Sequence, residues 1–146
     1  MAQVDHYLED EPPVANSIVV AVSAFVLDDA DQVLMVRDDD IYALPSGDVE
    51  VGETMTQAVV RVVEREAGVR IEVTGLVGVY SDPRHVIAYD NGEVRQEFSV
   101  CFRGRYVSGA DAVWVDQPLL PELTIHPAVR LRIQHGLDDR AEAYYS

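Results

Sequence analysis

The segment from residue 47 to residue 69 constrains the fold most, because a glycine-containing loop leads there directly into an amphipathic helix. Its apolar residues recur at helical spacing, at Ala58, Val59, Val63 and Ala67. Side chains with this spacing lie on one face of a helix, which then packs against a core. Thr54 is a favourable N-cap for this helix, and Gly68 is suited to end it. The sequence therefore predicts a helix over residues 54–67.

Runs of apolar and β-branched residues predict strands, and residues 18–27 are apolar enough for a central strand covered on both faces. An Asp-rich turn leads from it into a second strand at 33–37, which predicts a hairpin. The remaining predicted strands cover residues 41–44, 69–80 with a break at Gly75, 98–107 and 112–115. A second helix is predicted over 127–135, with Pro127 in its first turn and Gly136 at its end. This order predicts an α/β fold in which a mixed sheet is packed between helices.

The length of 146 residues and the hydrophobic content of 48% predict one compact domain. We place this domain at residues 17–146. Residues 1–16 are acidic, contain two adjacent prolines and show little apolar periodicity, so they are predicted to form a loosely held arm. No apolar run approaches the roughly 20 residues that span a bilayer, and the first residues lack the layout of a signal peptide. These observations predict a cytoplasmic protein with no membrane partner. The single cysteine, Cys101, is interpreted as a packed strand thiol.

The formal net charge is −15, and all 11 basic residues are arginines. So acidic a chain repels polyanions at long range, and its arginines form no basic stripe along the sequence. A nucleic acid polymer is therefore not expected as a partner. A small anionic ligand remains consistent with the composition, because a few arginines and bound divalent cations can hold it.

Residues 47–69 resemble the Nudix box, G-x5-E-x7-R-E-U-x-E-E-x-G-U, in which U is a bulky apolar residue. Seven residues occupy their pattern positions without a gap: Gly47, Glu53, Arg61, Val63, Glu66, Gly68 and Val69. The resemblance extends over roughly residues 17–135, since the flanking predicted strands also agree with the family. It implies a Nudix-type α/β/α sandwich with a mixed sheet between helices.

The resemblance also implies a chemistry, the hydrolysis of a nucleoside diphosphate linked to another group with the help of Mg²⁺ or Mn²⁺. Acidic residues of the box share one helix face and hold the cations, which neutralise the diphosphate and activate water. Gly47 implies close approach of the loop backbone to metal or phosphate. Glu53 and Arg61 are expected to form an ion pair that fixes the loop to the helix.

Two of the three acidic positions of the box are changed. The positions correspond to Val62, Arg65 and Glu66, so a single carboxylate remains. Glu64 does not replace the missing ones, because at about 100° per residue it projects roughly opposite Val62. The arginine at position 65 also competes with a cation for the neighbouring glutamate. These changes predict weak or impaired metal binding.

Glu97 is a candidate to supply a second carboxylate from a neighbouring strand. We therefore predict Glu66 and Glu97 as catalytic residues, and Glu66, Gly47 and Glu97 as the metal site. Two other interpretations stay open at this stage. In one, Glu97 is an exposed strand residue that pairs with Arg95 or Arg103; in the other, the loop acids Asp48 or Glu50 join Glu66 around one weakly held ion.

Three residues outside the box are predicted to bind substrate: Arg37, Tyr42 and Arg84. Each also has a simpler interpretation. Arg37 is placed to neutralise the aspartates that follow it, Tyr42 to pack as a strand residue, and Arg84 to belong to a plain turn. His126 and His135 have no ligand spacing to each other and are interpreted as structural.

The favoured hypothesis is a Nudix pyrophosphohydrolase. The alternative is a Nudix-fold module that binds a nucleotide or a similar anion without catalysis, with Arg65 in the place of cation charge. A scaffold or dimerisation domain without a ligand is a third hypothesis. The sequence does not choose the substrate, and it leaves a homodimer open.

Overall fold

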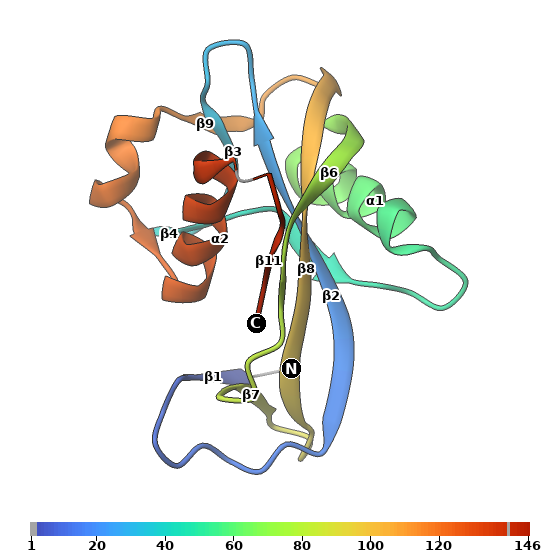
Figure 1. Ribbon diagram of the computed structural model, residues 1–146, viewed down its shortest axis with the longest axis vertical. Helices are drawn as coiled ribbons and strands as arrows, with labels where there is room; N and C mark the ends of the chain where they lie inside the picture. Colours follow the sequence, from blue (N-terminus) through green and yellow to red (C-terminus); the bar gives the residue numbers. More distant parts are fainter. Residues whose placement is uncertain (1–2, 140) are drawn as a thin grey trace.

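The computed structural model describes residues 3–139 and 141–146, and its elements follow the order expected from the sequence with several additions (Figure 1). The strands are β1 (Gln3–Tyr7), β2 (Ser17–Leu27), β3 (Val33–Asp38), β4 (Ile41–Ala43), β5 (Ser46–Asp48), β6 (Arg70–Tyr80), β7 (His85–Tyr89), β8 (Val94–Ser108), β9 (Val113–Val115), β10 (Thr124–Ile125) and β11 (Tyr144–Tyr145). The helices are α1 (Met55–Ala67), α2 (Pro127–Asp138) and a 3-10 helix, η1 (Gln117–Glu122). Within this part of the chain, every helix is too short or too polar to cross a membrane.

The apolar run of β2 lies at the centre of the sheet, as predicted. It pairs in parallel with β8 along its whole length, from Ser17 opposite Arg95 to Leu27 opposite Arg105. On its other edge it pairs antiparallel with β3 and with β5. Outside β8 lie β6 and β7, both antiparallel to it. The sheet is therefore mixed, as the order of elements predicts.

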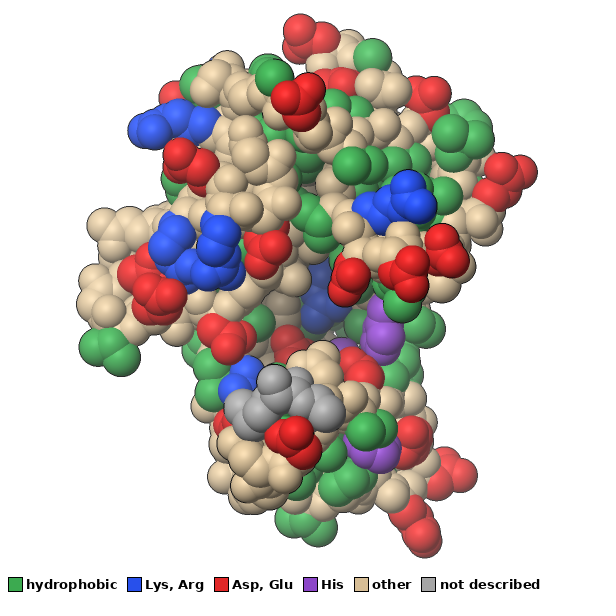
Figure 2. All heavy atoms as spheres, turned by 180° about the vertical axis from the view of Figure 1, so that it is seen from behind, with side chains coloured by type: hydrophobic (Ala, Val, Ile, Leu, Met, Phe, Trp, Pro, Cys, Tyr) green, Lys and Arg blue, Asp and Glu red, His purple; other side chains and the backbone are tan. Residues whose placement is uncertain are grey.

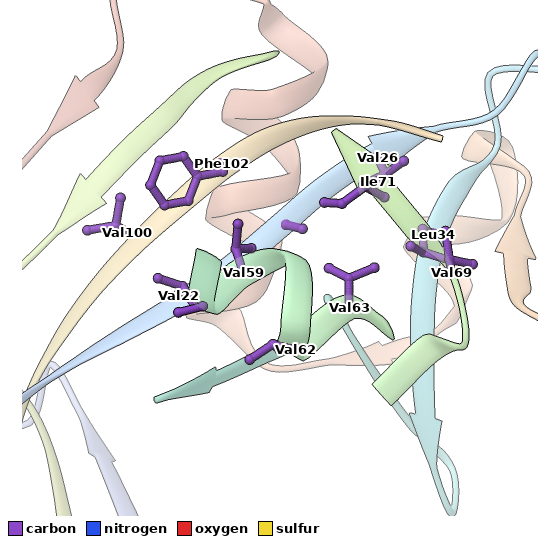
Figure 3. Close-up of a cluster of buried hydrophobic side chains, with 12 residues drawn as sticks. Val22, Val26, Leu34, Val59, Val62, Val63, Val69, Ile71, Val100 and Phe102 are labelled. Atoms are coloured by element: carbon purple, nitrogen blue, oxygen red, sulfur yellow. The ribbon is translucent and has the colours of Figure 1, made fainter. Parts of the chain in front are cut away.

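Helices cover both faces of this sheet, with α1 on one side and α2 on the other (Figure 1). Successive residues of a strand point to opposite faces, so β2 serves two cores. Val22 and Val26 pack with α1, whose Val59, Val62 and Val63 point toward the sheet (Figure 3). Phe25 belongs to a second core that includes residues of α2. The predicted α/β/α arrangement is confirmed.

Local signals set the bounds of α1, as the sequence predicts. The Thr54 hydroxyl accepts a hydrogen bond from the Gln57 amide (3.2 Å), and the Gln57 side chain accepts one from the Thr54 amide (2.9 Å). This reciprocal capping box satisfies amide groups that a helix start leaves free. At the other end Gly68 adopts a left-handed conformation with φ of 68°, which costs glycine little.

The N-terminal segment departs from its prediction, because residues 3–7 form β1 instead of a loosely held arm. They pair antiparallel with β7, from Gln3 opposite Tyr89 to Tyr7 opposite His85. The partner strand β7 is likewise absent from the sequence prediction, which gives a plain turn as the simpler interpretation of the adjacent Arg84. The two segments are far apart in sequence and neither has a strong alternating pattern, so the strand forms through pairing that local composition does not reveal.

Helix α2 also differs from its prediction, because it continues past Gly136 to Asp138. A Cβ atom at position 136 would lie 2.5 Å from Cγ of the Phe25 ring. The glycine therefore brings the helix close to the sheet and does not end it.

We predict that Gly136→Ala lowers the free energy of unfolding by about 1–3 kcal/mol, because its methyl group overpacks the contact with Phe25. Urea unfolding followed by circular dichroism measures the change. Gln134→Ala, an exposed change in the same helix, should stay within about 0.5 kcal/mol of the wild type. Equal stability of the Gly136 variant and the wild type would contradict the close contact.

Candidate functional site

The loop before α1 is held to the helix by the two residues that the sequence analysis pairs. Arg61 Nε donates to Glu53 Oε2 (2.7 Å), and Arg61 Nη2 donates to Glu53 Oε1 (3.0 Å) and to the Asp48 carbonyl oxygen (2.9 Å). The hydrogen bond from Arg61 is the main reason that the pKa of Glu53 lies below its usual value. One guanidinium thus joins both ends of the loop to the helix.

The helix face beside Gly47 carries the two changed box residues. A Cβ atom at position 47 would lie 2.9 Å from Val62 Cγ2 and 3.2 Å from Arg65 Nη2. Val62 is fully buried and belongs to the core under α1 (Figure 3). Arg65 Nη2 lies 3.5 Å from Glu66 Oε1 as an ion pair. Instead of a group of carboxylates, this face therefore offers one carboxylate that already faces a guanidinium, and it does not fit a cluster of cations.

A cavity of about 410 Å³ lies beside Gly47 between the sheet and the start of α2. Figure 2 shows a hollow on the side of the molecule opposite to the view of Figure 1, with acidic side chains around it. The lining residues with polar side chains are Gln3, Asp5, Ser23, Ser46, Asp48, His85, Tyr89, Arg95, Glu97, Ser99, His126 and Arg132. The structure thus brings Gly47 and Glu97, two of the predicted metal-site residues, to the same cavity.

Glu97 lies within β8 opposite Val19 of the central strand, and burial raises the pKa of its carboxyl above the usual value. The pairings considered for it at the sequence level are taken by other acids. Arg95 Nη1 lies 3.2 Å from Asp48, and its Nη2 lies 3.2 Å from Glu93; Arg103 pairs with Asp139. A half-buried carboxylate whose pKa is raised is a better proton acceptor than an exposed one.

Glu66 and Arg37 are placed elsewhere. They line a separate hollow of about 430 Å³. Arg37 Nε donates to the Asp39 carbonyl oxygen (2.7 Å), and the guanidinium lies 5.8 Å from the centre of the Tyr42 ring. The structure therefore groups Arg37 with Tyr42 and with the aspartates that follow β3, away from the cavity that holds Glu97.

Arg84 lies near the cavity but makes a local contact. Its Nη2 donates to Asp82 Oδ2 (2.7 Å), and its Nε donates to Asp82 Oδ1 (3.1 Å). It lines a smaller hollow of about 190 Å³. This hollow shares four lining residues with the cavity beside Gly47, namely His85, Glu97, Ala128 and Arg132. The guanidinium thus stays next to the site, engaged with its own turn.

Asp5, His85 and His126 form a cluster at one side of the cavity beside Gly47, and the sequence did not predict it. We name these three residues the histidine clasp. Within residues 3–139 and 141–146 it is the one group of three His, Cys, Asp or Glu side chains whose potential metal-binding atoms all lie within 4.8 Å of one another. His85 Nε2 lies 2.9 Å from Asp5 Oδ2, and His126 Nε2 lies 3.3 Å from Asp5 Oδ1. Tyr7 lies edge-on to both imidazoles. The clasp therefore ties β1 and β7 to the start of α2.

The position of the proton on the His126 ring determines whether the histidine clasp can bind a cation. Its Nδ1 accepts a hydrogen bond from the Ala128 amide (3.0 Å) at the start of α2. A neutral imidazole that accepts at Nδ1 carries its proton at Nε2, the atom that faces Asp5. That atom then has no lone pair for a cation, and a metal would have to break the helix cap. The clasp accordingly fits a carboxylate held between two imidazoles.

Comparison with known proteins agrees with this geometry. The family model of the NUDIX domain matches residues 18–127. The chain belongs to the Nudix family.

Individual relatives show how far the likeness to other Nudix proteins extends. An ADP-ribose pyrophosphatase of Methanocaldococcus jannaschii is 52% identical over 52 residues, which are 32% of this chain and only 31% of that relative's length. A solved NUDIX hydrolase of Nitrosomonas europaea is 23% identical, with a TM-score of 0.66 over 84% of this chain and 90% of its own. A solved ADP-ribose pyrophosphatase of Streptococcus suis is 17% identical, with a TM-score of 0.63 over 88% and 98%. At these identities the two solved structures show the Nudix fold.

We predict that the double variant Val62→Glu with Arg65→Glu restores a Nudix metal face. Its unfolding temperature without metal should fall, because a carboxylate replaces a buried valine. Saturating Mn²⁺ should then raise that temperature by several degrees, while it leaves the wild type nearly unchanged. Thermal unfolding with EDTA or Mn²⁺ measures both effects. Adding Glu66→Gln to the double variant should remove most of the Mn²⁺ effect; a double variant indifferent to Mn²⁺ would contradict the assignment of this face.

We predict that Asp5→Asn lowers the free energy of unfolding at pH 7 by about 1–2 kcal/mol and speeds amide exchange in β1. Burial acts to raise the pKa of Asp5, but hydrogen bonds from His126 and His85 outweigh it and hold that pKa well below its usual 3.8. A lowered folded-state pKa stabilises the protein fully above that usual value, and the contribution is lost as the pH falls through the folded-state pKa. The variant and the wild type should therefore converge in strong acid.

Urea unfolding across pH and hydrogen exchange at pH 7 test this prediction. Asp10→Asn removes an exposed carboxylate from the same N-terminal segment and serves as the matched control. If both variants lose the same stability, the histidine clasp contributes nothing of its own.

Proposed function

We propose that the chain is a pyrophosphohydrolase that cleaves a nucleoside diphosphate linked to another group, with its diphosphate in the cavity beside Gly47. One observation carries the proposal: the half-buried Glu97 and the backbone of Gly47 line the same cavity of about 410 Å³. Membership of the Nudix family supports the reaction type. The relatives from Methanocaldococcus jannaschii and Streptococcus suis are both named ADP-ribose pyrophosphatases, so ADP-ribose is the first substrate to test.

The proposed reaction is an attack of water on one phosphorus of the diphosphate. The bond between that phosphorus and the bridging oxygen breaks, and two phosphomonoesters leave. Glu97 accepts the proton of the attacking water, a role that suits a carboxyl whose pKa is raised by burial. A Mg²⁺ or Mn²⁺ ion that arrives with the substrate phosphates needs only one or two protein carboxylates, and it would neutralise charge on the diphosphate.

Glu66 takes a lesser part in this proposal than Glu97. It pairs with Arg65 and lines a hollow from which Glu97 is absent. The buried Val62 and the adjacent Arg65 are also the residues that favour the alternative, a module that binds a nucleotide without catalysis. Turnover decides between the two functions.

We predict metal-dependent hydrolysis of ADP-ribose to phosphomonoesters, with kcat reduced about 100-fold or more by Glu97→Gln because the variant removes the proton acceptor. The rate of the wild type should fall as the pH drops through the raised pKa of Glu97, since the base must be unprotonated. Phosphate release coupled to a phosphatase measures the rate with Mg²⁺, with Mn²⁺ and with EDTA.

Two variants on α1 complete the test. Glu64→Gln removes an exposed carboxylate from the same helix and should keep the wild-type rate. Glu66→Gln reports whether the remaining box glutamate shares the cation, through a raised metal requirement. If ADP-ribose, nucleoside triphosphates and dinucleoside polyphosphates all bind but none is hydrolysed, the chain is a binding module and the proposal is wrong.

A further inference from the structure

Arg132 of α2 is a buried cation with an unsatisfied donor. Its residue is 6% exposed, and its guanidinium lies over the Tyr80 ring, 4.6 Å from the ring centre. Its Nε is fully buried and makes no hydrogen bond to any residue that the structure describes. Burying a guanidinium without a partner is costly, so native proteins pair such groups with a carboxylate, water or a ligand.

The position of Arg132 points to a ligand. Its side chain lines both the cavity beside Gly47 and the smaller hollow next to it. Glu97 lines the same two hollows, yet in the described part of the chain no ion pair within 4.0 Å joins the two side chains. Arg132 therefore borders both hollows. Burial raises the pKa of Glu97, and the positive charges of His85 and Arg132 act to lower it, so Arg132 interacts with Glu97 at a distance and not as a direct ion pair.

Apart from Glu97, the other charges of the cavity are already matched. Arg95 pairs with Asp48 and Glu93. Asp5 lies between the two imidazoles of the histidine clasp. Arg132 is thus the basic group of this cavity that remains available to an incoming anion.

We propose that Arg132 binds the phosphate groups of the ligand directly, so that this cavity can bind a diphosphate without the divalent cation that the proposed hydrolysis uses. A guanidinium offers parallel N–H groups that match two phosphate oxygens. The cation–π contact with the Tyr80 ring holds the guanidinium in place before the anion arrives. The inference rests on the proposed function in one respect, because it uses the same cavity as the substrate site.

The residues that differ from the Nudix box explain why an arginine would be needed at this cavity. Val62 and Arg65 remove two carboxylates from the helix face that cations would occupy. Positive charge from the protein then takes over one task of the cation, which is to neutralise the bound diphosphate. In a chain with a net charge of −15, a small polyanion needs such a localised site to overcome repulsion from the surface.

Inorganic pyrophosphate is the probe, and its binding is measured by isothermal titration calorimetry in buffer with EDTA. We expect the wild type to bind it, and Arg132→Met to bind at least about tenfold more weakly, because charge-assisted hydrogen bonds are lost. Arg132→Lys keeps the charge but not the planar fork and should lie between the two. Arg105→Gln removes an exposed arginine of β8 that pairs with Glu72, and it should bind like the wild type.

A stability measurement guards against a folding defect. Arg132→Met should unfold at a temperature no lower than the wild type, because methionine keeps an apolar stem against Tyr80 and removes a buried charge. Unaltered binding in this variant would overturn the inference, as would binding of pyrophosphate by the wild type only when Mg²⁺ is present. Pyrophosphate binding without any hydrolysis of ADP-ribose would instead refute the proposed function and leave the anion site intact.

Discussion

The parallel pairing of β2 with β8 is the constraint on which the rest of the structure depends. It runs the full 11 residues of β2, and no local turn enforces it, so the apolar side chains on both faces must supply its stability. One face receives α1, and with it β5, the strand that contains Gly47. The other face receives α2, and with it Arg132. Because β8 extends past the region covered by the helices, the same pairing sets Glu97 beside the cavity between these layers.

The altered residues of the Nudix box follow from this packing. A carboxylate at position 62 would point from α1 toward Gly47, at the border between the core and the loop. Valine at that position joins the core instead, fully buried against the sheet (Figure 3). The side chain therefore contributes apolar burial, which stabilises the fold by about 1.5–3 kcal/mol for a residue of this kind. Glu53 and Arg61, which shape the loop, form their ion pair. The box therefore keeps its structural role, while Val62 on its metal-binding face is part of the core.

The features that the sequence reveals are those set by near neighbours. The spacing of Thr54 before the helix predicts the cap, and the resemblance to the Nudix box implies the ion pair between Glu53 and Arg61, which are eight positions apart. The pairing of β1 with β7 joins residues about 80 positions apart, and the contact between Asp5 and His85 depends on that pairing. The burial of Arg132 is equally unpredictable from the sequence. Arginines are mostly exposed, and only the packing of α2 against the sheet buries this one. Substrate-binding residues chosen from sequence were strand and turn residues, and Arg37 and Arg84 both engage their own turns.

Electrostatics explains why a buried, unsatisfied arginine persists in a protein this acidic. The surface charge excludes long polyanions, so selectivity for a small anion has to come from inside the cavity. There Asp5 is compensated by the two histidines and Asp48 by Arg95, whereas among the described residues Arg132 and Glu97 make no direct ion pair. We expect a methionine in its place to leave the empty protein at least as stable, and a stability cost kept for the sake of binding is typical of functional residues. The unfavourable burial of Arg132 is thus best understood as preorganisation, because a guanidinium already stripped of water and held on Tyr80 needs little rearrangement to receive a phosphate.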